Sequence, residues 1–108
     1  MDTISYLQDL GLSPDNISQM HHGSCGTAID VATSIDTPLF APFDCFIEVG
    51  YEDDGFGLWV LLHDDNKKLR LAHLNRVIHK SSVKRGEIFA WSGNSGCTTG
   101  PHVDVRQS

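Results

Sequence analysis

The first ten residues carry hydrophobic side chains at helical spacing, and they differ in this from the rest of the chain. Ile4, Leu7 and Leu10 recur every third position, which places them on one face of a helix. Gly11 follows directly, and glycine is the residue that most often ends a helix. The pattern therefore predicts a short amphipathic helix that packs its apolar face on another element.

A second short helix is expected just after the first. Ser13 and Pro14 suit the cap and the first position of a helix, and Ile17 and Met20 continue at helical spacing. Residues 1–20 carry no recognisable chemistry. We therefore predict that residues 1–24 form a helical and loop extension, which packs on the main domain or contacts a partner, and that residues 25–108 form the main domain.

From residue 27 onward the hydrophobic pattern changes to that of β-strands. The segments at 58–63 and 68–74 are rich in apolar residues and are separated by a polar turn, as in a hairpin. Further short apolar runs, separated by turn residues, lie at 27–32, 39–42, 45–50 and 88–91. Many short strands of this kind predict a mainly β fold with an antiparallel sheet. One face of this sheet is expected to be polar and open, and a functional site would lie on that face.

Composition narrows the function classes. A chain of 108 residues is long enough for one domain, and a net charge of −6 argues against binding nucleic acid. No apolar run approaches the roughly 20 residues of a membrane span. Asp2, Asp9 and Asp15 replace the basic start of a signal peptide, which predicts a cytoplasmic or phage-virion location. The odd number of three cysteines predicts reduced, mostly buried thiols.

The last seventeen residues hold the clearest candidate chemistry. A glycine-rich loop leads into an alternating strand. His102 and Asp104 point to one face of such a strand, and Val103 and Val105 to the other. An imidazole and a carboxylate therefore lie side by side, next to a loop. An isolated pair of this kind is also common on solvated strands.

Several motifs together resemble the lysostaphin-type (LytM-like) zinc endopeptidases, which cut the peptides of bacterial peptidoglycan. SGNSGCTTGPHVDVR at 92–106 is similar to the family signature S-G-x-T-G-x-S-T-G-P-H-L-H-F-E. DTPLFAPFDC at 36–45, LAHL at 71–74 and VKRGEIFAWSG at 83–93 also match family segments in the same order. The resemblance covers residues 25–107 and implies a groove on an antiparallel sheet.

The same resemblance implies a metal site in which two of three ligand positions have changed. Asp30 stands where the family has its aspartate ligand, but Gly26 stands where the first histidine ligand belongs. Asp104 replaces the second histidine ligand. His73 and His102 match the two histidines that the family uses for proton transfer and transition-state stabilisation. In such a site zinc would take three protein ligands and keep one position for water.

Two rearrangements would restore a metal site. His22 or Cys25, in the segment before Asp30, would replace the missing ligand if that segment folded inward. Alternatively, Asp30, Asp104, His73 and His102 would form a cluster for zinc or for a harder cation such as manganese. The histidines would then act as ligands, and hydrolysis would suffer.

Two functions of different class follow from these residues. The first is a catalytically impaired or inactive module with a binding, structural or regulatory role, such as a phage tail or virion component or the partner of a cell-wall hydrolase. It would bind a peptidoglycan peptide or a protein, without a cofactor. The alternative is an active metal-dependent peptidoglycan endopeptidase with altered ligation. A β module without groove chemistry is a third, more remote possibility.

Overall fold

The computed structural model describes residues 3–23, 26–53, 55–94 and 102–107. This part of the chain contains the helix α1 (Thr3–Leu10), the 3-10 turn η1 (Pro14–Asn16) and nine strands. None of the helices in these ranges is long and apolar enough to cross a membrane. The strands are β1 (Ile17–Gly23), β2 (Gly26–Ala32), β3 (Pro38–Phe40), β4 (Cys45–Glu52), β5 (Gly57–His63), β6 (Lys68–Val77), β7 (Ser82–Val83), β8 (Ile88–Ser92) and β9 (His102–Gln107).

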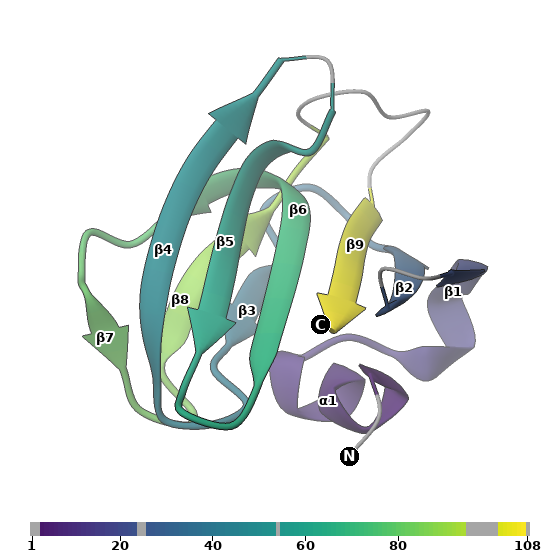
Figure 1. Ribbon diagram of the computed structural model, residues 1–108. Helices are drawn as coiled ribbons and strands as arrows, with labels where there is room; N and C mark the ends of the chain where they lie inside the picture. The colour runs from purple at the N-terminus through teal and green to yellow at the C-terminus, as the bar shows by residue number, and fades with distance from the viewer. Residues whose placement is uncertain (1–2, 24–25, 54, 95–101, 108) are drawn as a thin grey trace.

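The strands form one antiparallel sheet that bends into two layers. Its main path runs β1-β2-β9-β6-β5-β4-β7, and β8 branches off to pair with both β6 and β3. Every pairing is antiparallel. Figure 1 shows β4, β5, β6 and β9 side by side, with β3 and β8 behind them. The prediction of a mainly β, antiparallel fold is confirmed, and so is the hairpin formed by β5 and β6.

Strand β6 joins the two layers, and it does so at a bulge. Between the pairs Val60↔Leu71 and Leu58↔Leu74, two residues of β6 face a single residue of β5. The extra residue is at Ala72 or His73, where the strand turns from β9 towards β8. A bulge bends a strand and increases its twist, which is what lets one strand serve both layers.

The structure of the N-terminal segment matches the sequence-based prediction only in the first half of the segment. Helix α1 is confirmed, and it ends at Gly11, whose φ of 91° is readily accessible to glycine. The predicted second helix through Ile17 and Met20 is wrong. The cap predicted at Ser13 is present, because its Oγ accepts from the Asp15 amide, but it starts only the short turn η1.

Strand β1 takes the place of the second helix because β2 offers it a free edge. Its backbone pairs with β2 from Ile17 to Gly23, and those cross-strand bonds satisfy groups that a helix would satisfy internally. The segment also ends in two histidines and a glycine, which are poor helix formers. Residues 17–23 thus belong to the same sheet as the rest, and the division of the chain at residue 24 stays a prediction.

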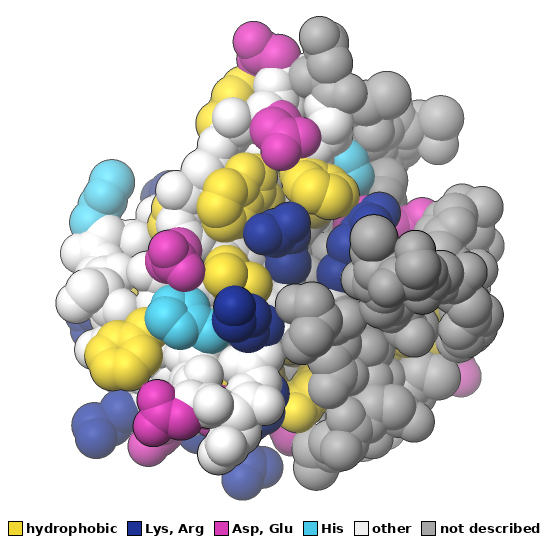
Figure 2. All heavy atoms as spheres, in the orientation of Figure 1, with side chains coloured by type: hydrophobic (Ala, Val, Ile, Leu, Met, Phe, Trp, Pro, Cys, Tyr) yellow, Lys and Arg dark blue, Asp and Glu magenta, His cyan; other side chains and the backbone are white. Residues whose placement is uncertain are grey.

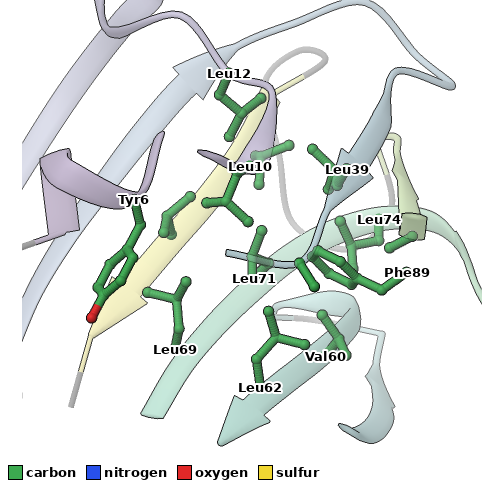
Figure 3. Packing of buried hydrophobic residues seen from close by; sticks show 14 of the residues in the cluster. Tyr6, Leu10, Leu12, Leu39, Val60, Leu62, Leu69, Leu71, Leu74 and Phe89 are labelled. Carbon is green, nitrogen blue, oxygen red and sulfur yellow. The ribbon is translucent and has the colours of Figure 1, made fainter. Parts of the chain in front are cut away.

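The hydrophobic core lies between the main sheet, α1 and the β3–β8 layer. In Figure 3, Tyr6 and Leu10 point from the N-terminal segment towards Leu69 and Leu71 of β6. These side chains are 0–5% exposed. Burial of each such side chain contributes about 1.5–3 kcal/mol. Within the described residues, α1 and β3–β8 cover only this inner face, and no helix or strand covers the opposite face of β5, β6 and β9, which we call the open face.

Candidate functional site

A row of residues crosses three neighbouring strands on the open face. Asp30 of β2 pairs with Asp104 of β9, and Asp104 pairs with Ala72 of β6. Residues that are directly opposite in a sheet point to the same face. Their sequence neighbours on β2 and β9 are completely buried on the inner face: Ile29, Val31, Val103 and Val105. The two carboxylates predicted as metal ligands are therefore cross-strand neighbours on the open face.

Asp104 is nearly buried and is engaged by an arginine. Its side chain is 8% exposed, against 41% for Arg106. The Arg106 Nε lies 3.3 Å from Oδ1, and Nη2 lies 3.3 Å from Oδ2. Arg106 follows Asp104 by two residues, so alternation along β9 places both on one face. The negative charge of Asp104 is balanced by a guanidinium of the same strand.

His73 occupies an unusual backbone conformation at the bulge of β6. Its φ is 63°, and its amide donates to the carbonyl of Phe56 at 2.8 Å. The residue is 6% exposed. Left-handed backbone is uncommon for residues other than glycine, and residues held in this way cluster at functional sites. His73 directly follows Ala72, the cross-strand partner of Asp104. A catalytic role for His73 stays a prediction.

The other predicted site residues are described only in part. The backbone of His102 pairs with Ala32, and that of His22 pairs with Thr27. Their side chains lie outside the described residues, as does Cys25. These roles therefore stay predictions.

Gly26 begins β2, four residues before Asp30. In an extended strand this separation is roughly 13 Å. Side chains of two residues that far apart do not meet at one metal ion unless the strand bends. Within the described ranges no three His, Cys, Asp or Glu side chains form a group that would hold a metal. With Asp104 paired to Arg106, the described side chains do not fit the zinc site that the resemblance implies.

A cluster of arginine and aromatic side chains that was not predicted from the sequence lies beside Asp104. Arg70 of β6 is the cross-strand partner of Arg106. The Arg70 guanidinium carbon lies 5.0 Å from the centre of the Trp59 ring and 5.6 Å from that of Phe56, and the Arg106 carbon lies 5.0 Å from Phe56. Figure 2 shows basic side chains next to hydrophobic ones in the middle of this face. We call Phe56, Trp59, Arg70 and Arg106 the arginine–aromatic cluster.

Gly50 of β4 makes room for the indole of this cluster. It pairs with Trp59, and a Cβ atom on Gly50 would lie 2.2 Å from the ring. Only glycine lets the ring lie this close to the β4 backbone. Trp59 therefore lies over β4 and presents its ring to Arg70. The alternation of β9 was the signal for Arg106, but nothing in the sequence indicated that Arg70 lies opposite.

Cys45 is the free cysteine that the structure describes, and it is buried. Burial raises the pKa of its thiol to about 11, and the nearby carboxylates of Asp64 and Asp44 add to the effect. A thiol with so high a pKa is a poor nucleophile at neutral pH. The prediction of a buried, reduced thiol holds for Cys45, whereas Cys25 and Cys97 lie outside the described residues.

Several known proteins are similar to this chain in amino-acid sequence. An uncharacterized metalloprotease of Haemophilus influenzae is 39% identical over 79 residues, which are 69% of this chain and 17% of that protein. The peptidoglycan DD-endopeptidase ShyB of Vibrio cholerae is 32% identical over 77 residues, which are 68% of this chain and 18% of that protein. The chain thus spans less than a fifth of the length of these relatives.

Solved structures agree with the fold. Lysostaphin of Staphylococcus simulans superposes with a TM-score of 0.69 at 27% identity, over 86% of this chain and 42% of that one. The catalytic domain of the prophage-encoded M23 protein EnpA from Enterococcus faecalis gives 0.67 at 30% identity, over 81% and 70% of the two chains. The family model of peptidase family M23 matches residues 24–107. The chain therefore belongs to peptidase family M23, as a member of its lysostaphin and LytM group.

Proposed function

We propose that this chain is a peptide-binding module of family M23 that does not hydrolyse its ligand. The observation that carries the proposal is the ion pair between Asp104 and Arg106. Asp104 stands at a position where the lysostaphin-type signature has a zinc ligand, and here its charge is already balanced.

Electrostatics favours the ion pair over a metal at this position. Arginine keeps its positive charge at all relevant pH values, so a zinc ion bound to Asp104 would have a cation within a few ångströms. Turning Asp104 away from Arg106 would also leave a partly buried charge without its partner, which is unfavourable. Gly26 has no side chain to offer as a further ligand.

The proposed ligand is a peptide of peptidoglycan. Relatives such as ShyB of Vibrio cholerae are peptidoglycan DD-endopeptidases, and the open sheet face with its aromatic rings suits an extended peptide. The resemblance to the prophage-encoded EnpA supports a phage particle as one setting for such a module, in which it would attach to the wall or guide a partner hydrolase.

The deciding experiment measures metal content and wall binding together. Protein is purified without added metal or chelator, its zinc is quantified, and zinc is titrated by calorimetry. Binding to purified peptidoglycan and release of peptides from it are measured on the same sample. We expect far less than one zinc per chain, binding to peptidoglycan, and no release. About one tight zinc per chain, lost in Asp30→Ala, together with peptide release, would overturn the proposal.

An active enzyme with altered ligation is the second candidate, and the conformation of His73 favours it. This histidine keeps a left-handed backbone beside the row that holds Asp30 and Asp104, a cost that a pure scaffold has little reason to keep. Under this candidate, His22, Cys25 or His102 would complete the metal site. Cleavage of peptidoglycan that requires added zinc or manganese, and that is lost in His73→Ala, would establish it.

A double variant addresses the alignment on which both candidates depend. Gly26→His with Asp104→His restores the family's residues at the two changed positions and releases Arg106 from its carboxylate. We expect this variant to bind zinc more tightly than the wild type, provided that the start of β2 bends to bring position 26 near Asp30. Unchanged zinc affinity in a folded variant would count against the correspondence of Gly26 with the family's first ligand.

A further inference from the structure

Arg70 and Arg106 face each other across β6 and β9, and this placement needs an explanation. Like charges directly opposite in a sheet destabilise it. Both guanidinium groups nevertheless contact the same ring, that of Phe56, with their central carbons 5.6 and 5.0 Å from its centre. The ring holds the two cations on one side of the sheet, next to each other.

The two arginines differ in how their charges are balanced. Arg106 has the carboxylate of Asp104. Within the part of the chain that the structure describes, no ion pair balances Arg70. Its Nε is also a buried donor that has no hydrogen-bond partner among the described residues. A buried donor that is left without a hydrogen bond costs free energy. An acceptor that bound the Arg70 guanidinium would offset this cost.

We propose that the arginine–aromatic cluster binds a free carboxylate group of the peptide ligand between Arg70 and Arg106. The planar fork of an arginine matches the two oxygens of a carboxylate. Trp59, which lies over Gly50 and contacts Arg70 at 5.0 Å, would pack on the apolar part of the residue that carries the carboxylate. This inference rests on the proposed function and names the group that the module recognises.

The charges around the cluster favour one carboxylate over a polyanion. Asp104 lies beside Arg106 in the next row of the sheet, and Asp30 lies beyond Asp104 in that same row. Glu48 lies on the other side, opposite Leu61, which pairs with Arg70. A nucleic acid or other extended anion would meet these carboxylates, whereas a single carboxylate fits between them. The net charge of −6 adds to this selection.

The test compares two forms of one synthetic peptide by titration calorimetry. The peptide has the sequence of a peptidoglycan stem and ends either in a free D-amino-acid carboxylate or in the corresponding amide. We expect the wild-type protein to bind the amide about tenfold more weakly than the acid. Arg70→Gln should weaken binding of the acid by about the same factor and abolish the difference between the two forms.

Arg76→Gln is the matched control, because Arg76 lies on the same strand and also stacks on an indole, that of Trp91 at 4.0 Å. It should keep the preference for the acid. Arg70→Lys keeps the charge but loses the fork, so it should retain only part of the preference. It also serves if Arg70→Gln fails to fold. Equal loss in Arg76→Gln and Arg70→Gln would overturn the inference.

The wild-type result separates this inference from the proposed function. If the acid and the amide bind equally well, the carboxylate site is wrong, but the chain still binds wall peptides. If folded protein binds neither peptide nor peptidoglycan, the proposed function is wrong. If only the acid binds, and Arg70→Gln removes that binding while Arg76→Gln does not, both stand.

Discussion

The two faces of strands β6 and β9 arise from the same alternation of side chains, but one face is apolar and buried and the other is charged. On the inner face Leu69, Leu71, Val103 and Val105 are at most 1% exposed and pack under α1. On the outer face of the same strands lie Arg70, Asp104 and Arg106. Successive residues of one strand thus serve a core on one side and a charged surface on the other.

The two faces also differ in how they affect the stability of the fold. The four inner-face side chains named above all gain from burial. The outer face places two arginines opposite each other, leaves the Arg70 Nε without a hydrogen bond in the described structure, and lies beside the left-handed backbone of His73. Costs of this kind, gathered in one place, are expected at a functional site rather than at an ordinary surface.

The largest effect is expected from truncating a leucine on the inner face. Leu71→Ala should lower the free energy of unfolding by about 2–5 kcal/mol, because it leaves a cavity in a closely packed core. Leu61→Ala is the matched change on the outer face, where Leu61 is only partly buried, and it should cost less than half as much. Urea unfolding of both variants measures this, and equal losses would mean that the outer face is also a packed interface.

A smaller effect is expected from filling the space under Trp59. In Gly50→Ala the new Cβ would overlap the indole, so the ring must move away from β4. We expect a loss of about 1–3 kcal/mol and weaker binding of the carboxylate peptide. Gly86→Ala is the control: its φ of 90° strains an alanine, but nothing lies near the new atom. It should cost about 1 kcal/mol and leave peptide binding unchanged. Unchanged peptide binding in Gly50→Ala would mean that Trp59 does not contribute to the carboxylate site.

Asp104→Asn should cost still less stability and should have an opposite effect on binding. Arg106 is 41% exposed, so water partly replaces the lost carboxylate, and we expect a loss of about 1 kcal/mol. Arg106 is then free to engage a ligand, so the peptide acid should bind more tightly than to the wild type, and its preference over the amide should grow. Weaker binding would show that Asp104 positions Arg106 instead of competing with the ligand.

The parts of the fold that depend on nearby residues were predictable from sequence. Helix α1 is encoded by Ile4, Leu7, Leu10 and Gly11, and the β5–β6 hairpin by two apolar segments around a polar turn. Strand β1 was not predictable in this way. Its conformation is set by the free edge of β2, a tertiary contact that overrides the weak helical spacing of Ile17 and Met20.

The candidate site shows the same limit. Alternation was enough to place Asp104, and in retrospect Arg106, on one face of β9. The pairing of Arg70 with Arg106 depends on the register between β6 and β9, and these two residues lie more than thirty positions apart in sequence. The bulge at Ala72 and His73 shifts the register between β6 and β5. A change of one residue in register would send these side chains to the other face, so the sequence alone could not assemble the cluster.

The turn between β5 and β6 helps to set the register of these two strands, and it provides the smallest predicted effect. Asp64 Oδ1 accepts from the amides of Asn66 and Lys67 at 2.8 and 2.9 Å, and Oδ2 lies 2.7 Å from the Lys67 ammonium. The hydrogen bond from the Lys67 side chain, followed by that from the Asn66 amide, lowers the pKa of Asp64 below its usual 3.8. A lowered carboxyl pKa stabilises the fold above the unfolded-state pKa, and this contribution disappears as the pH falls through the folded-state value.

Asp64→Asn keeps an oxygen that can accept in the turn but removes the charge. We expect it to be slightly less stable than the wild type at pH 7, and the difference should shrink as the pH falls through the lowered pKa of the wild-type carboxyl. Asp65→Asn, which removes a charge at the exposed neighbouring position, is the control. Urea unfolding at a series of pH values, from 7 to well below the usual carboxyl pKa of 3.8, measures both. A difference for Asp64→Asn that does not change with pH would mean that the geometry of the turn, and with it the register of β5 and β6, depends on more than the charge of Asp64.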